Sequence, residues 1–338
     1  MKKMLAAQFL APDRIEAIEV GVPELRDGEA LVRVEACGIC GSDLFIVSGD
    51  HPRARPPLTI GHEFCGRVVE VAGADQEIAP GDRVTLYPLI SCGECFVCKN
   101  GQPHVCRSLG LYGFDDEGGM ADFVRVPVTS LMKIPETMSG QAGALLEPLA
   151  VGVHAVARSP VKQDDMAIVI GAGPIGLVTA LALRHHGVER IRVTDLNPFR
   201  LQLARELGFN ALDGARDDLL EIIYRETNGE GADVVFEVAG APASALEMTE
   251  LVRCRGTVVN VSVFKTPVEV RLQSVNFKEL TIIGSRVYTP ADFLTAIEAV
   301  EGLPIEKLIT HSFPLQDVAE AFQIFKSGGD VCKVLVKP

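Results

Sequence analysis

Short runs in which hydrophobic and polar residues alternate dominate the chain up to about residue 135. Turn-forming Pro, Gly and Asp residues separate these runs, as is typical of β-strands joined by tight turns. The clearest strands are predicted at residues 30–35, 66–71, 82–86 and 121–126. We therefore expect a mainly β region in this part of the chain.

The pattern changes at about residue 150. A wholly apolar run at 167–170 precedes a helical pattern at 175–186, and a second strand and helix follow. Strands that alternate with helices indicate βαβ units and a parallel sheet. The later elements are expected at 190–194 (strand), 198–207 (helix), 233–237, 256–262 and 280–285 (strands), 290–300 and 315–326 (helices) and 333–336 (strand).

Composition narrows the class of protein. The 338 residues are enough for two domains, and with 47% hydrophobic and 23% charged residues each can bury a core. The formal net charge of −13 repels nucleic-acid phosphates and anionic membranes. We therefore expect neither nucleic acid nor a membrane as a partner.

Residues 1–7 lack the apolar region and cleavage site of a secretory signal, and no apolar run reaches the 18 residues of a membrane span. We expect a cytoplasmic protein. Because disulfides are rare in reducing compartments, its nine cysteines point to metal binding or to chemistry.

Residues 171–176 read Gly-Ala-Gly-Pro-Ile-Gly and lie between the apolar strand and the next helix. In that context GxGxxG is typical of dinucleotide-binding folds, since its glycines allow a tight turn and let a pyrophosphate approach the helix N-terminus. The predicted cofactor contacts in this turn are Gly171, Gly173, Pro174, Ile175 and Gly176.

Asp195 is expected to end the next strand. A carboxylate there can bind both ribose hydroxyls and repels a 2′-phosphate, so it favours NAD over NADP. Arg200 could flank the adenine, and it keeps NADP open as the second choice.

Four cysteines follow the spacing C-x2-C-x2-C-x7-C, and they are Cys92, Cys95, Cys98 and Cys106. Four such thiolates fit a closed tetrahedral zinc site, which braces a loop and leaves no position for substrate. The alternatives are an iron–sulfur cluster, a redox dithiol or cysteines without a ligand. A ferredoxin run has a shorter last spacing followed by Pro, whereas Arg107 follows here, and a redox pair needs only two cysteines. The spacing therefore predicts one structural zinc ion.

Three further segments, at 38–43, 61–64 and 147–151, each contain metal-binding residue types. Their candidate ligands are Cys40, His62, Glu63 and Glu147. Taken singly, a Cys is usually a small buried residue, and a His or Glu is usually hydrogen-bonded or solvated. These residues indicate a metal site only in combination with the glycine turn and the cysteine loop.

Together the motifs resemble the zinc-containing medium-chain dehydrogenase/reductase family, in its polyol branch, which includes sorbitol and galactitol-phosphate dehydrogenases. The resemblance covers essentially the whole chain, including GICGSD, GHEFCG, EPLAVG and the tail segment KELTIIGSR. It implies an α/β fold in which a GroES-like, mainly β catalytic domain (1–150 and 286–338) is interrupted by a Rossmann NAD-binding domain with a doubly wound parallel sheet (151–285).

The resemblance also implies a second, catalytic zinc ion bound by Cys40 and His62. Glu63 is the carboxylate ligand in the polyol-type pattern, and Glu147 either exchanges with Glu63 or holds the metal-bound water; both are retained as candidates. Further cofactor contacts are assigned to Val261, Ser262 and Val263.

A zinc ion with three protein ligands keeps an open position and acts as a Lewis acid toward the substrate hydroxyl. By resemblance, Ser42 relays the alcohol proton and Asp43 supports the ligands. Several relatives place a histidine three residues after this serine, but this chain has Phe45. The proton must then leave through ribose and water, or through another residue such as His51.

Arg286 matches the point where an arginine enters the active site of polyol dehydrogenases, and it can bind hydroxyl, carboxylate or phosphate groups. A surface arginine at a strand end is the alternative. We expect hydride transfer to NAD from a secondary alcohol of a polyol or sugar acid. L-Threonine 3-dehydrogenase and other alcohol dehydrogenases are the alternatives, whereas the candidate ligands disfavour a non-catalytic binding or regulatory protein and a zinc-free quinone reductase. The family implies a homotetramer or dimer.

Overall fold

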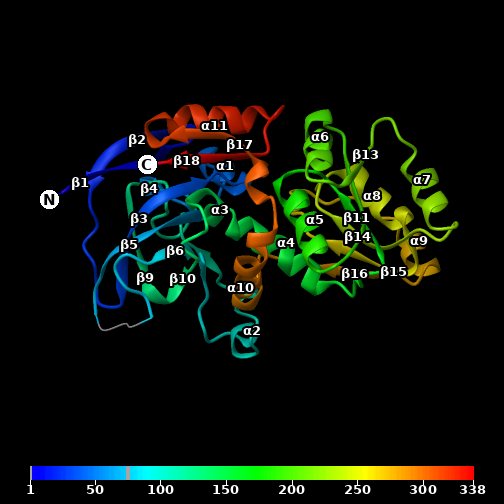
Figure 1. The fold of residues 1–338 in the computed structure, drawn as a ribbon, viewed down its shortest axis with the longest axis horizontal. Helices are drawn as coiled ribbons and strands as arrows, with labels where there is room; N and C mark the ends of the chain where they lie inside the picture. The colour runs from blue at the N-terminus through cyan, green and yellow to red at the C-terminus, as the bar shows by residue number, and fades with distance from the viewer. Residues whose placement is uncertain (1, 74–76) are drawn as a thin grey trace. The chain divides into compact units, whose positions relative to one another are not determined.

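The computed structural model describes residues 2–73 and 77–338, which form two compact units (Figure 1). The first contains Met1–Glu147 and Ile309–Pro338, and the second contains Pro148–Leu308. Residues 286–308, which the sequence assigned to the catalytic domain, thus lie in the second unit.

The first unit is mainly β. Its strands are β1 (Lys3–Ala11), β2 (Arg14–Gly21), β3 (Glu29–Gly38), β4 (Leu58–Thr59), β5 (Glu63–Val71), β6 (Arg83–Leu86), β7 (Leu89–Ile90), β8 (Gly110–Leu111), β9 (Phe123–Pro127), β10 (Leu131–Lys133), β17 (Ile309–Pro314) and β18 (Lys333–Lys337). Its helices are α1 (Gly41–Val47), α2 (Phe96–Lys99), α3 (Gly140–Ala144) and α11 (Val318–Ser327), and α4 (Leu146–Arg158) begins at its edge. The largest sheet has the order β10-β6-β5-β3-β18-β17, with β9 on β3.

The C-terminal segment completes this sheet. β18 pairs antiparallel with β3, with Leu335 opposite Gly38 and Val336 opposite Cys37, and parallel with β17. Residues 333–336 are all buried, as the apolar run 334–336 leads one to expect, and the buried Lys333 is the exception. The pairing places the start of β18 beside the end of β3.

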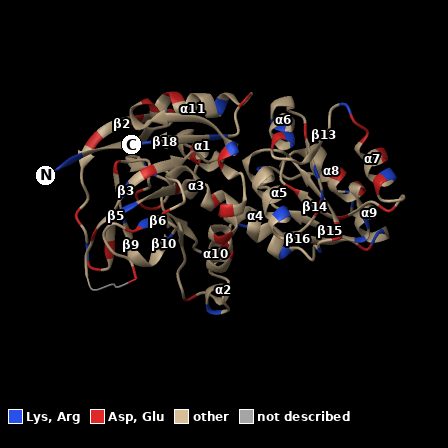
Figure 2. Cartoon of the chain, in the orientation of Figure 1, with Lys and Arg blue, Asp and Glu red and all other residues tan. Residues whose placement is uncertain are grey.

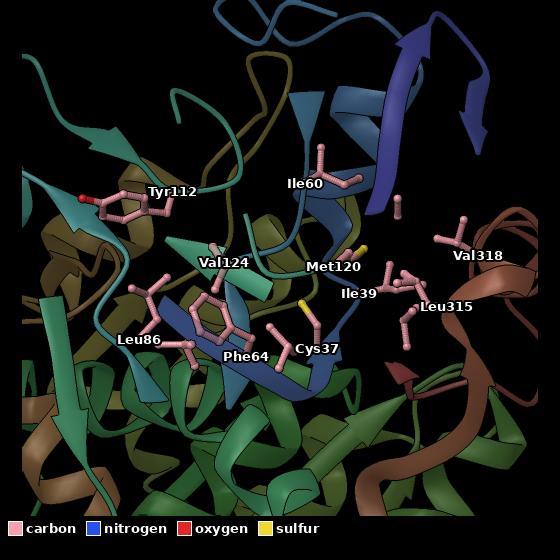
Figure 3. Packing of buried hydrophobic residues seen from close by; sticks show 14 of the residues in the cluster. Cys37, Ile39, Ile60, Phe64, Leu86, Tyr112, Met120, Val124, Leu315 and Val318 are labelled. Atoms are coloured by element: carbon pink, nitrogen blue, oxygen red, sulfur yellow. The ribbon is translucent and has the colours of Figure 1, made fainter. Parts of the chain in front are cut away.

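One hydrophobic core unites these parts of the first unit (Figure 3). Cys37 and Phe64 from β3 and β5 lie beside Leu86 from β6. Leu315 and Val318, from the C-terminal segment, join the same cluster near Ile39. The two distant parts of the sequence therefore fold as one unit.

The second unit is a parallel α/β domain. Its strands are β11 (Met166–Ile170), β12 (Arg190–Asp195), β13 (Asn210–Asp213), β14 (Ala232–Glu237), β15 (Val252–Asn260) and β16 (Thr281–Gly284). Its helices are α5 (Pro174–His185), α6 (Pro198–Glu206), α7 (Leu219–Glu226), α8 (Pro242–Leu251), α9 (Leu272–Phe277) and α10 (Pro290–Ala299). The sheet order β13-β12-β11-β14-β15-β16 is the doubly wound Rossmann arrangement.

The fold class and the change of pattern near residue 150 are confirmed. β11 is buried on every residue, as a central strand of a parallel sheet requires. Basic and acidic residues both occur in each unit (Figure 2). No helix in the described part of the chain is long and apolar enough to cross a membrane.

Candidate metal centres and nucleotide-binding turn

The four cysteines of the loop converge on one point. The Sγ–Sγ distances are 3.4 Å for the pairs 95–98 and 92–106, 3.9 Å for 95–106 and 4.0 Å for 92–98. A tetrahedron with Zn–S bonds of about 2.3 Å has edges of about 3.8 Å. The sulfur atoms of Cys92, Cys95, Cys98 and Cys106 are therefore spaced as the tetrahedral coordination of a structural zinc ion requires.

Backbone N–H groups near these sulfur atoms stabilise the thiolate form. Backbone N–H groups lower the pKa of Cys92, Cys95 and Cys106, because they stabilise the thiolate. Burial raises the pKa of Cys98 to about 12, and its neighbouring thiols add to the shift. Only the thiolate binds zinc, so these N–H groups favour the metal-binding form at three of the four positions.

A second group of ligand atoms lies inside the first unit. Cys40 is the N-cap of α1, His62 directly precedes β5, and Glu63 begins β5 opposite Gly38 of β3. One ligand atom from each of Cys40, His62 and Glu63 lies within 4.8 Å of the others. Thus the end of β3 and the start of β5 bring together residues from two separate sequence motifs.

Asp43 links two of these ligands. Its Oδ2 accepts a hydrogen bond of 2.8 Å from the Cys40 backbone N–H, and its Oδ1 lies 3.6 Å from Nδ1 of His62. The Asp43 side chain is fully buried. Burial alone lowers the pKa of His62, but the Asp43 carboxylate raises it well above its ordinary value.

Two buried polar atoms without hydrogen-bond partners in this group fit the binding of a metal ion. Asp43 Oδ1 and His62 Nδ1 are buried and have no hydrogen-bond partner within the described chain. When a metal binds the other ring nitrogen, Nδ1 carries the proton and can donate it to Asp43, which is how carboxylates orient ligand histidines. The donor set of thiolate, imidazole and carboxylate suits zinc.

Three aromatic rings cover the His62 side of the group. The Phe114 ring meets His62 edge-on at 5.2 Å between centroids and His51 at 4.9 Å. His51 in turn lies 5.9 Å from Phe45. Phe114 contacts His62 directly and restricts the orientation of its imidazole.

Lys333 is a site residue that sequence reasoning missed. It begins β18, its side chain is only 3% exposed, and its Nζ donates a hydrogen bond of 2.6 Å to Glu63 Oε1. Burial alone lowers the pKa of Lys333, but Glu63, then Cys40 and Glu147, raise it above its ordinary value. Nothing in the sequence around this short strand marks the lysine, since its partner lies 270 residues away.

The other predicted residues of this group lie on the neighbouring helices. Ser42 is in the first turn of α1, next to Asp43. Glu147 is buried in the first turn of α4, where it acts electrostatically on Lys333. It is not part of the compact ligand group found among the described residues, whereas Glu63 is.

The glycine turn joins β11 to α5, as predicted. Pro174 takes the first position of α5 after the N-cap Gly173. A Cβ at Gly176 would lie 1.7 Å from the carbonyl oxygen of Gly171, so the turn excludes any side chain there. Gly176 therefore allows α5 to pack closely against the end of β11.

Asp195 ends β12 and is tied to this turn. Its Oδ2 accepts a 2.7 Å bond from the Ala172 N–H, and its Oδ1 accepts from the Leu196 and Asn197 N–H groups. The nearest Arg200 nitrogen lies 3.9 Å from the carboxylate. Asp195 and Arg200 thus sit together where an adenine ribose is expected.

Glu237, at the end of β14, is a second residue that the sequence analysis missed. It is fully buried and accepts hydrogen bonds from the Gly240 N–H (2.8 Å) and the Ser244 hydroxyl (2.6 Å), and a closer one from Ser262. It thereby connects the loops that follow β14 and β15, and the latter contains the predicted contacts 261–263. Arg286 lies just beyond β16, next to Val287, whose φ of 44° is rare for a β-branched residue.

Comparisons with known proteins agree with both units. The alcohol dehydrogenase GroES-like domain family matches residues 26–136, and the zinc-binding dehydrogenase family matches residues 174–302. A 2-dehydro-3-deoxy-L-galactonate 5-dehydrogenase of Pseudoalteromonas atlantica is 34% identical over 99% of this chain and 98% of that protein. An erythritol/L-threitol dehydrogenase of Mycolicibacterium smegmatis is 35% identical over 100% and 98%.

Solved structures lead to the same family. The crystal structure of a zinc-binding dehydrogenase of Sinorhizobium meliloti 1021 bound to NADP has a TM-score of 0.94 at 34% identity, and the match covers all of both chains. The chain therefore belongs to the zinc-containing medium-chain alcohol dehydrogenase family, as its motifs predicted.

Proposed function

We propose that this protein is a zinc-dependent dehydrogenase that oxidises a secondary alcohol of a polyol or sugar acid, with NAD as the hydride acceptor. The observation that carries the proposal is the buried group of Cys40, His62 and Glu63, oriented by Asp43. The relatives that act on a sugar acid and on tetritols support this substrate class.

In this proposal Cys40 and His62 hold the catalytic zinc together with Glu63 or Glu147. The zinc ion supplies Lewis acidity, which lowers the pKa of an alcohol hydroxyl. Ser42, in the first turn of α1 and two residues after Cys40, would take up the hydroxyl proton as it passes its own proton on. Arg286 binds the polar groups of the substrate away from the reacting carbon.

We infer that the proton leaves Ser42 through water and ribose rather than through His51. His51 Nδ1 already accepts the Ala54 backbone N–H at 3.0 Å, so in the neutral ring the proton sits on the other nitrogen. Burial and the neighbouring Arg53 lower the pKa of His51, which keeps the ring neutral. The ring then has no free lone pair with which to receive a proton. His51→Gln is expected to change kcat by less than about threefold, whereas Ser42→Ala should lower it about a hundredfold or more.

NAD is the preferred cofactor in this proposal, because Asp195 would face a 2′-phosphate with negative charge. Arg200 beside it, and the relative that binds NADP, make NADP the alternative. Asp195→Ser should therefore lower kcat/KM for NAD and raise it for NADP, whereas Arg200→Ala should lower kcat/KM for NADP. An unchanged NAD/NADP ratio in Asp195→Ser would contradict the assignment.

A homo-oligomer is also proposed. β16 is the outermost strand of its sheet, and Ile282 on it is 43% exposed. On the preceding helix α9, Leu272 and Phe277 are 71% and 75% exposed. Unpaired strand edges and exposed apolar side chains favour association with a second copy. Light scattering should show a dimer or tetramer, and Ile282→Lys should shift it toward monomer.

We also propose that the protein works in a reducing compartment such as the cytoplasm. The cysteines of the loop and the buried Cys37, Cys65 and Cys332 form no disulfides, which is typical of such a compartment.

The direct test is a screen of NADH production by the zinc-loaded protein with polyols, sugar acids and L-threonine. We expect the highest kcat/KM with a polyol or sugar acid. Cys40→Ser should abolish turnover, whereas Cys254→Ser should leave it unchanged, because the Cys254 thiol is exposed and lies outside both metal groups. A preference for threonine would support that alternative instead. Turnover that survives in Cys40→Ser would overturn the proposal.

A further inference from the structure

Val287, the residue after Arg286, has an unusual backbone conformation. Five non-glycine residues in the described part of the chain have a positive φ, and Val287, with a φ of 44°, is the β-branched one among them. A branched side chain makes the left-handed region costly, so such a residue stays there only when its surroundings hold it. The segments on either side of Val287 must therefore fix its conformation.

Both neighbouring segments are anchored. On the N-terminal side, β16 pairs with β15, and the N–H of Ser285 donates to the carbonyl of Asn260 at 2.9 Å. On the C-terminal side, Tyr288 is fully buried, and its ring meets that of Phe293 in α10 edge-on at 5.4 Å between centroids. The two residues between these anchors therefore have little conformational freedom.

Asp292 holds the C-terminal anchor in place. Its Oδ2 accepts hydrogen bonds from the N–H and the hydroxyl of Thr289, at 2.8 and 2.5 Å, and forms a third of 2.8 Å with Nδ1 of His154 in α4. These bonds close the first turn of α10 and fasten it to α4, which lies beside it (Figure 1). Burial alone raises the pKa of Asp292, but the bonds from His154 and Thr289 lower it below its ordinary value. We call Thr289, Asp292 and His154 the clasp.

The guanidinium group of Arg286 is available to a ligand. Arg286 is exposed, and no carboxylate in the described part of the chain pairs with it. A guanidinium binds a carboxylate through two parallel N–H groups, so it must be aimed more accurately than for a single hydroxyl. Because the backbone is held at both ends, the left-handed turn at Val287 sets the direction in which the Arg286 side chain extends.

We propose that the clasp, acting through the left-handed Val287, positions Arg286 for the carboxylate of a sugar-acid substrate. This inference rests on the proposed function, since that function assigns substrate binding to Arg286. Without the clasp, Val287 can return to the conformations that β-branched residues favour, and the direction of Arg286 then changes. The residues of the clasp are thus positioning residues, which act on the substrate only through Arg286.

The opposing explanation is that the clasp only caps α10 and fastens it to α4. Its loss would then weaken the fold and lower kcat/KM for every substrate alike. If the clasp positions Arg286, its loss changes the preference between a substrate that carries a carboxylate and one that does not. The ratio of the two kcat/KM values therefore separates the explanations.

The test uses the zinc-loaded full-length protein, the sugar acid with the highest kcat/KM, and the polyol that has CH₂OH in place of its carboxylate. Asp292→Ala should lower the acid-to-polyol ratio of kcat/KM about tenfold or more, chiefly through KM for the acid, because the carboxylate is bound equally in the ground and transition states. Asp218→Ala is the matched control. It removes the N-cap of α7, where Asp218 accepts the Glu221 N–H at 2.9 Å, and should leave the ratio unchanged.

A second substitution tests the role of the backbone. Asn tolerates the left-handed region, so Val287→Asn can keep the turn without the clasp. The double variant Asp292→Ala/Val287→Asn should therefore raise the ratio at least about threefold above that of Asp292→Ala. If Asp292→Ala does not fold, His154→Phe, which removes only the bond to α4, should lower the ratio in the same direction. His154→Asn should lower it less, since an amide N–H can replace the Nδ1 donor.

An unchanged ratio in folded Asp292→Ala, or in His154→Phe where that variant takes its place, would overturn the proposal. A double variant that recovers none of the lost ratio would overturn it too. Wild-type protein that oxidises polyols but no sugar acid would also overturn it, while leaving the proposed function intact. Wild-type protein that oxidises neither class would refute the proposed function instead.

Discussion

The two metal-binding groups of the first unit are built in opposite ways. The cysteine loop takes all its ligands from residues 92–106, and its thiols range from exposed Cys92 to buried Cys106. The buried group takes Cys40 from α1, His62 and Glu63 from the start of β5, and the nearby Lys333 from the C-terminal strand. A closed site can be local, whereas a site with an exchangeable position depends on the whole unit.

The surroundings of the two groups also differ. In the loop, backbone N–H groups, the other thiols and the Ser108 hydroxyl adjust the ligands. In the buried group, Asp43 orients His62 and Lys333 binds Glu63. Charged side chains around a metal tune its affinity and reactivity, so we assign bracing of the fold to the loop and reactivity to the buried group.

The largest effect is expected in the loop. Cys98→Ser should release the structural zinc and lower the free energy of unfolding by about 4 kcal/mol or more, because the loop loses the bonds that close it. Chemical denaturation with zinc counting measures this. Cys254→Ser is the matched control, and equal stability of the two variants would show that the loop does not depend on metal.

A smaller effect is expected at Asp43. Asp43→Asn keeps the shape of the side chain but removes the charge that faces His62, so metal affinity at the buried group should fall about 10- to 100-fold. Asp50→Asn, an exposed position just after α1, should have no effect. Competition with a chelator measures the affinity. Loss of the structural zinc instead would contradict the division of roles.

The two metal-binding groups should release zinc at different pH values. Because Asp43 raises the pKa of His62 above its ordinary value, a proton competes with zinc for the metal-free ring at a higher pH than it would at an ordinary histidine. The lowered pKa values of Cys92, Cys95 and Cys106 keep those thiols ionised to lower pH. As pH falls, the buried group should therefore release zinc first. Zinc counting after dialysis at a series of pH values tests this order. Release of zinc from the loop at a higher pH than from the buried group would contradict the prediction.

The smallest effect is expected at Phe114, whose ring packs edge-on against His62. Phe114→Leu should weaken metal binding at the buried group by about threefold, since such aromatic contacts contribute about 0.5–1.5 kcal/mol. Phe96→Leu, an exposed ring in α2 of the loop, should change neither site. A larger loss in Phe96→Leu would mean that packing matters more in the loop than in the buried group.

The sequence could predict what is encoded locally. The cysteine spacing specifies the loop, and the glycine turn with its apolar strand specifies the start of the Rossmann unit. Helix α4 was not predicted, since Pro148 suggests an interruption, although proline is tolerated in the first helical turn. The short strand β13 also escaped prediction, because its four residues carry too little periodicity.

The ion pairs could not be predicted, because they depend on long-range pairing. Glu63 stands in a recognisable motif, but its partner Lys333 is the first residue of an ordinary-looking strand. Only the register of β18 against β3 brings the two together. Glu237 is similar, since its hydrogen bonds to Gly240, Ser244 and Ser262 join two loops that the sequence alone does not connect.

Counting zinc in the wild type and in Cys40→Ser tests the two-site account most directly. We predict two zinc ions per chain in the wild type, and one in a folded, inactive Cys40→Ser protein whose stability stays near that of the wild type. A single zinc ion in the wild type, or two ions and retained activity in Cys40→Ser, would contradict the account.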